Sequence, residues 1–140
     1  MPAYPSALRV GTDLVHVPEV RESIEQFGDR YLSRVYTSGE LATCASLDGW
    51  SAHRLAARFA AKEAVIKVLR PTADMSYSDA EVVLGADGAP AIALWGAARE
   101  RANAIRLSGG SVSMSHDGEY ATAVFAASVT EEQTPRNVEL

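Results

Sequence analysis

The longest helical pattern in the chain covers residues 54–70, read as R-L-A-A-R-F-A-A-K-E-A-V-I-K-V-L-R. It lacks proline and glycine, is rich in alanine, and stops at Pro71, which predicts a helix of about four turns. With Ser51 as its N-cap, we expect this helix to span about residues 52–69. One helical face carries Leu55, Phe59 and Ile66, and an opposite face carries Ala57, Ala61, Ala64 and Val68. Two apolar faces predict a helix packed on two sides, near the middle of the fold.

Alternation of apolar and polar residues predicts strands at both ends of the chain. The first strand has Leu8, Val10, Thr12 and Leu14 on one face, and Arg9, Gly11, Asp13 and Val15 on the other. Two hairpins are expected later, with strands at 79–84 and 89–94 and at 111–116 and 120–129. Further helices are expected at 19–27, from about 39, and at 95–105.

This order of elements predicts an α+β fold with a mainly antiparallel sheet packed around the central helix. We expect one domain over residues 1–129 and a polar, disordered tail over residues 130–140. A chain of 140 residues has room for one core of this kind.

Composition excludes several classes of function. A net charge of −5 argues against general nucleic-acid binding, and no apolar run is long enough to span a membrane. The single cysteine, Cys44, is expected to be a packing residue and suits a reducing compartment, so we expect a cytoplasmic protein. Residues 54–70 nevertheless hold five basic side chains and one acid, a local charge of +4 that would attract a phosphorylated ligand or an acidic partner.

Two carboxylates, Asp13 and Glu63, interrupt otherwise apolar elements. Because aspartate is depleted in strands, Asp13 implies either a β-bulge or a metal or hydrogen-bond site. Two carboxylates with water completing the shell is how Mg²⁺ is usually held on a diphosphate ligand. Lys67 follows Glu63 at i,i+4, so it either stabilises charge on a leaving phosphate or forms an ordinary ion pair worth about 0.2–0.5 kcal/mol.

Four segments together resemble the holo-[acyl-carrier-protein] synthases, the small bacterial type of 4′-phosphopantetheinyl transferase. They are V-G-T-D-L-V (10–15), R-V-Y-T-S-G-E (34–40), R-F-A-A-K-E-A-V-I-K (58–67) and V-S-M-S-H-D-G-E-Y-A (112–121). They occur in order and at the family's spacing, and D-G-A-P-A-I-A-L (87–94) lies in register with them.

The resemblance implies transfer of the phosphopantetheine arm of coenzyme A to a serine of an apo acyl carrier protein, with release of adenosine 3′,5′-bisphosphate. It implies Mg²⁺ as cofactor, Asp13 and Glu63 as metal ligands, and Glu63 also as an activator of the attacking serine. Lys67 would stabilise the departing phosphate. Contacts to coenzyme A are implied for Arg54, Arg58, Lys62, Lys67 and His116. The family is typically trimeric, with active sites between subunits.

Two positions depart from the family's pattern. Glu19 stands where a basic residue commonly serves carrier docking, so the carrier surface is expected to differ. Tyr77 stands where tryptophan is frequent, which we interpret as a packing change with little bearing on the chemistry. Two other functions remain open on the residues: a non-catalytic module that binds coenzyme A or a carrier, and a phosphohydrolase acting on a small diphosphate.

Overall fold

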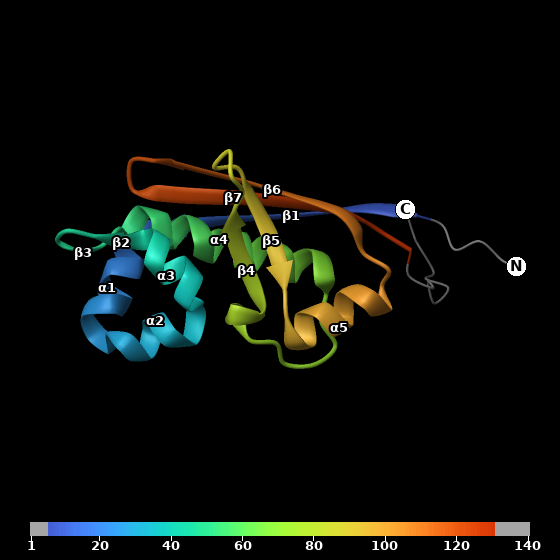
Figure 1. Cartoon of the computed structure of the whole chain (residues 1–140), viewed down its shortest axis with the longest axis horizontal. Helices are drawn as coiled ribbons and strands as arrows, with labels where there is room; N and C mark the ends of the chain where they lie inside the picture. The colour runs from blue at the N-terminus through green and yellow to red at the C-terminus, as the bar shows by residue number, and fades with distance from the viewer. Residues whose placement is uncertain (1–5, 131–140) are drawn as a thin grey trace, which may run out of the picture.

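A three-stranded antiparallel sheet forms one layer of the molecule in the computed structural model, which describes residues 6–130. The strand order is β1-β7-β6, with the two long strands of the last hairpin beside the first strand of the chain (Figure 1). The strands are β1 (Ala7–His16), β6 (Ser108–Asp117) and β7 (Tyr120–Val129). All three predicted strands are therefore confirmed, with β6 extending further than expected.

The central helix α4 (Ala52–Leu69) lies along this sheet, as predicted (Figure 1). Ser51 is its N-cap, since the Ser51 hydroxyl accepts a hydrogen bond from the backbone N–H of Arg54 at 3.4 Å. Arg70 ends the helix in the left-handed conformation, with φ 47°. Gly11 permits the close approach of helix and sheet, because a Cβ there would lie 2.0 Å from the carbonyl oxygen of Ala64.

The register of β1 against β7 resolves one of the alternatives for Asp13. Pairing is continuous from Ala7 opposite Val129 to His16 opposite Tyr120, so β1 has no bulge. Asp13 pairs with Ala123 on the face of β1 that also carries Gly11, and therefore points toward α4. The explanation that remains is a site that uses its side chain.

Three helices follow β1; the first and third pack against α4, and the second packs against the first and against the turn that precedes β4 (Figure 1). They are α1 (Val17–Phe27), α2 (Asp29–Val35) and α3 (Ser38–Cys44). Thr37 caps α3, in a reciprocal capping box with Glu40. The short helix α2 was not predicted, nor was the small ladder of β2 (Ala45–Ser46) and β3 (Gly49–Trp50) that leads into α4.

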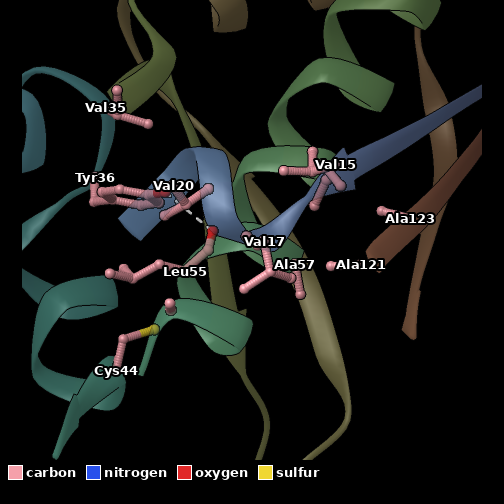
Figure 2. Close-up of a cluster of buried hydrophobic side chains, with 14 of the residues drawn as sticks. Val15, Val17, Val20, Val35, Tyr36, Cys44, Leu55, Ala57, Ala121 and Ala123 are labelled. Atoms are coloured by element: carbon pink, nitrogen blue, oxygen red, sulfur yellow. Dashed lines mark hydrogen bonds between the residues drawn. The ribbon is translucent and has the colours of Figure 1, made fainter. Parts of the chain in front are cut away.

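Figure 2 shows the apolar core at this end of the molecule. Val17, Val20 and Leu55 are almost fully buried, and the Tyr36 hydroxyl donates a hydrogen bond to the carbonyl oxygen of Leu55 at 3.1 Å. Cys44 is a fully buried free thiol whose pKa is raised by burial. It is a packing residue, as the sequence predicts.

The C-terminal half of α4 is covered by the middle of the chain. There the structure has a single 3₁₀ turn, η1 (Tyr77–Asp79), then the hairpin of β4 (Ala80–Leu84) and β5 (Pro90–Leu94), then α5 (Gly96–Ala104). The hairpin and the helix are confirmed within one or two residues at each end. Together with the antiparallel pairing of every ladder among residues 6–130, these elements confirm the α+β class.

The predicted tail can be checked only at its first residue. The backbone N–H of Thr130 donates to the carbonyl oxygen of Ile105, so the chain is still held there. Residues 131–140 lie outside the described residues. Within the described part, no helix is long and apolar enough to cross a membrane.

One face of the sheet is left open. On β1, Leu8, Val10 and Leu14 are 73%, 56% and 64% exposed, and on β7 the neighbouring Val124 is 39% exposed. Figure 1 shows α4 and the other helices on the opposite face only. Because monomeric proteins rarely expose contiguous apolar patches on a sheet, this face is a candidate interface.

Candidate active site

Asp13 and Lys67 meet between β1 and α4. The Lys67 ammonium lies 3.5 Å from Asp13 Oδ1 and donates a hydrogen bond to the carbonyl oxygen of Thr12 at 2.6 Å. The Lys67 side chain is 52% exposed and that of Asp13 21% exposed, so this pair lies at the surface rather than in the core. The ordinary i,i+4 pair of Lys67 with Glu63 is absent from the ion pairs of residues 6–130, which leaves the Glu63 carboxylate available.

Glu63 is instead bonded to Tyr77. The Tyr77 hydroxyl donates to Glu63 Oε1 at 2.8 Å, and this hydrogen bond is the main reason that the pKa of Tyr77 rises to about 12. Burial and the charges of Glu63 and Asp13 raise that pKa further, in that order. The hydroxyl therefore stays protonated at neutral pH, and it lies within electrostatic reach of both carboxylates.

The residues at this point fit a magnesium ion. Asp13 and Glu63 supply hard oxygen donors. Lys67 forms its ion pair with Asp13 and none with Glu63 among the described residues. In the described part of the chain, no group of three or more histidine, cysteine or acidic side chains could hold a metal. Two carboxylates without a complete protein cage suit Mg²⁺, which keeps several waters and shares its shell with substrate phosphates.

Lys62 does not belong to this surface. Its side chain is fully buried, and its ammonium lies 2.6 Å from Glu40 Oε1, which is also fully buried. The same ammonium donates to the carbonyl oxygens of Tyr77 and Ala80 at 3.2 and 2.8 Å. An ammonium has three donors, and all three are used. This geometry is at odds with the expected phosphate contact of Lys62 and gives the residue a structural role.

The other basic residues expected to contact coenzyme A lie toward the start of α4. The helical rise places Arg58 about 8 Å and Arg54 about 14 Å along the axis from Glu63. Arg58 is 7% exposed and its Nε has no hydrogen-bond partner within residues 6–130. Arg54 is exposed. His116 on β6 is also exposed, and its ring centroid lies 5.5 Å from that of His53.

Two participants were missed from the sequence. Tyr77 does pack as expected, with its ring centroid 5.4 Å from that of Phe59, but its hydroxyl also contacts a candidate metal ligand. The interpretation of Tyr77 as a packing change alone is therefore wrong. In the sequence, Glu40 stands out only as the last residue of the family-like segment 34–40. Its separation of 22 positions from Lys62 gives no local signal of their pairing.

Comparison with known proteins assigns the family. The sequence pattern of the 4′-phosphopantetheinyl transferase superfamily matches residues 9–125, and the chain belongs to this superfamily. Among its relatives is a holo-[acyl-carrier-protein] synthase of Gloeobacter violaceus, 45% identical over 84% of this chain and 90% of that protein. Another, from Dehalococcoides mccartyi, is 39% identical over 86% of this chain and 98% of that protein.

Solved structures agree with this assignment. The complex of the Chronobacterium ammoniagenes synthase with coenzyme A superposes with a TM-score of 0.76 at 31% identity, covering 86% of this chain and 96% of that one. The Helicobacter pylori synthase in complex with coenzyme A gives 0.74 at 26% identity, over 85% and 99%. The fold is thus that of the small synthases over nearly their whole length.

Proposed function

We propose that this chain is a magnesium-dependent holo-[acyl-carrier-protein] synthase, which transfers the 4′-phosphopantetheine arm of coenzyme A to a serine of an apo acyl carrier protein. The observation that carries the proposal is the pairing of Asp13 with Lys67 between β1 and α4, with Glu63 one helical turn before Lys67 and bonded to Tyr77, in a chain that matches relatives of this activity over nearly their full length. The buried free thiol of Cys44 fits a reducing, cytoplasmic setting.

The reaction follows from the charges at the site. The serine oxygen attacks the phosphorus that carries pantetheine, and the bond from this phosphorus to the bridging oxygen breaks, releasing adenosine 3′,5′-bisphosphate. In this proposal Glu63 accepts the serine proton, and the Lys67 ammonium stabilises charge on the departing phosphate. Asp13 and Glu63 would hold Mg²⁺, which when bound offsets the negative charge of the diphosphate.

The remaining basic residues are proposed to hold the nucleotide end of coenzyme A. The unpartnered Nε of the nearly buried Arg58 is a donor that a phosphate oxygen would satisfy. Arg54 and His116 are exposed close to the N-terminal end of α4 and its neighbouring strand, where a second phosphate would meet them. Lys62 is left out of this set because its donors are used inside the protein.

The carrier is proposed to dock at a pocket between the end of α1 and α2, rather than along the glutamates of α1. Helix α1 carries three glutamates and one arginine, which would repel an acidic carrier. A surface pocket next to it is lined by Ser23, Phe27, Arg30, Tyr31 and Arg34. It combines an exposed aromatic ring with two guanidinium groups. Helix α2 packs against η1, which carries Tyr77, so this pocket lies on the same side of the molecule as the Tyr77–Glu63 contact.

The open face of the sheet supports assembly into a homotrimer. Val10 lies near the middle of that face, so Val10→Asp is expected to convert the trimer into monomers, because each copy would bury an unpaired carboxylate. Sedimentation equilibrium measures the mass. Leu47→Asp, at a fully exposed position off the sheet, is the matched control and should leave the trimer intact. A wild-type monomer, or a Val10→Asp trimer, would show that copies do not meet on this face.

Mass spectrometry of the carrier tests the function itself. After incubation with coenzyme A, Mg²⁺ and an apo carrier, we expect the carrier mass to increase by one phosphopantetheine arm. Omission of Mg²⁺ or of the enzyme is the control and should leave the carrier unmodified. Hydrolysed coenzyme A with unmodified carrier would identify a phosphohydrolase instead, and no change in either would identify a binding module. A panel of fatty-acid and polyketide carriers in the same assay would define which is served.

A further inference from the structure

The orientation of the Glu63 carboxylate depends on one contact. The hydroxyl of Tyr77 donates to Glu63 Oε1, and within residues 6–130 that carboxylate has no other hydrogen bond and no ion pair. Lys67, which might have held Glu63 from one turn away, is turned to Asp13 and Thr12. Without the tyrosine hydroxyl, a half-buried glutamate side chain with three rotatable bonds would be free to leave the site.

Tyr77 is itself fixed at two further points. Its ring lies against Phe59 of α4, with centroids 5.4 Å apart and an interplanar angle of 38°. Its backbone carbonyl accepts a hydrogen bond from the Lys62 ammonium at 3.2 Å. Lys62 is in turn held by Glu40 of α3 and by the carbonyl of Ala80. The position of the Tyr77 hydroxyl is therefore fixed by contacts that extend to the buried Glu40–Lys62 ion pair.

We propose that Tyr77 is a positioning residue for Glu63, and that a relay of contacts from Glu40 through Lys62 and Tyr77 fixes the direction of the Glu63 carboxylate. The hydroxyl donates to Oε1 of Glu63. Oε2 has no partner within residues 6–130, so it can bind the cation or accept the proton of the attacking serine. This inference rests on the proposed function. It gives the buried Lys62 a task in the site that does not require contact with coenzyme A.

Tyr77→Phe is the specific test, because it keeps the ring against Phe59 and the backbone carbonyl for Lys62 and removes only the hydroxyl. Removing a group that orients a metal ligand typically costs about 10–100-fold in metal affinity or activity. We expect a loss of this size in kcat, an equal rise in the Mg²⁺ concentration needed for half-activity, and an unchanged KM for coenzyme A. Ser78→Ala removes a neighbouring hydroxyl of η1 that bonds only to Ser76, and is the matched control.

Binding of Mn²⁺ alone provides a readout without turnover. Titration of the free enzyme with Mn²⁺, followed by electron paramagnetic resonance, should show about tenfold weaker binding by Tyr77→Phe than by the wild type or Ser78→Ala. Thermal melting is recorded on all three. Unchanged Mn²⁺ affinity and kcat, or a lower Tm with unchanged Mn²⁺ affinity, would show that Tyr77 only packs.

The two proposals fail in different ways. A wild-type enzyme that leaves the carrier unmodified overturns the proposed function, while the Mn²⁺ titration still decides the role of Tyr77. An active wild type whose Tyr77→Phe variant matches it in kcat and in Mn²⁺ affinity overturns the positioning role alone. Absence of both transfer and Mn²⁺ binding in the wild type overturns both.

Discussion

Glu63→Gln is expected to abolish transfer while the protein stays folded. Glutamine keeps the shape of the side chain and still offers a carbonyl oxygen to the Tyr77 hydroxyl, so the geometry at 2.8 Å is retained and only the charge is lost. A neutral amide neither accepts the serine proton nor binds Mg²⁺ strongly. Loss of a general base alone typically costs about 10²–10⁴-fold, and loss of a metal ligand adds to it. The measurement is the rate of carrier modification.

Asp13→Asn is expected to have an effect of the same order, for a related reason. It removes the second carboxylate and also the charge 3.5 Å from the Lys67 ammonium. Glu100→Gln, on the exposed side of α5, removes one negative charge away from the site and is the matched control. Circular dichroism confirms folding of all three variants. Near-normal activity of both Glu63→Gln and Asp13→Asn would contradict the metal assignment.

Elements with a long, regular pattern could be predicted from the sequence. The α4 pattern has no breaker before Pro71 and a serine N-cap, and the strand 120–129 was predicted with its observed bounds. Helix α2 has seven residues and begins at Asp29, directly after Gly28, whose φ is 53°, and it has no side-chain cap. A helix that short is stabilised by tertiary packing rather than by its own propensity, so its sequence carries little signal.

The faces of β1 show a second limit. Alternation separates Leu8, Val10 and Leu14 from the residues opposite them, but it does not say which face is buried. The apolar face turned out to be the exposed one, whereas the face with Gly11 and Asp13 packs on α4. The exposed apolar face is the basis for the proposal that copies meet there, and the carboxylate turned toward α4 is the basis for the proposed site.

For the site, the sequence singles out charged residues within apolar elements, and the structure brings two of them together. Asp13 and Lys67 lie together although 54 positions separate them, because β1 and α4 are neighbours. The partners of Glu63 and Lys62 could not be predicted. Tyr77 comes from an irregular segment after Pro71, and Glu40 reaches Lys62 only when α3 packs on α4.

Helical geometry divides the polar residues of α4 into two lines, but it cannot tell a solvated flank from a buried one. With Glu63 and Lys67 on one flank and Arg58 and Lys62 on the other, two arrangements are possible: coenzyme A wraps around the helix, or one flank serves the site of a neighbouring subunit. The burial of Lys62 decides how much of its flank can contact the ligand. Because Lys62 points into the core, only Arg58 of its line remains to contact the nucleotide, and the ligand need not follow that flank.

Lys62→Met is expected to lower the free energy of unfolding by about 3–5 kcal/mol, the usual cost of leaving one member of a buried ion pair without its partner. Methionine fills a similar volume, but the fully buried Glu40 carboxylate would lose its 2.6 Å contact and the carbonyls of Tyr77 and Ala80 would lose a donor. Burial lowers the pKa of Lys62 despite the attraction of Glu40, so charge is disfavoured at this depth and a carboxylate left there without its partner is costly. Urea unfolding measures the change.

Lys67→Met on the same helix is the matched control. The Lys62 variant is expected to lose stability, whereas the Lys67 variant is expected to lose activity. Lys67 is half exposed, so its replacement should change stability by less than about 0.5 kcal/mol while reducing kcat. The double variant Glu40→Leu with Lys62→Met should regain part of the lost stability, because no charge then remains buried. Normal stability of Lys62→Met together with a raised KM for coenzyme A would instead mean that Lys62 leaves the core to bind a phosphate.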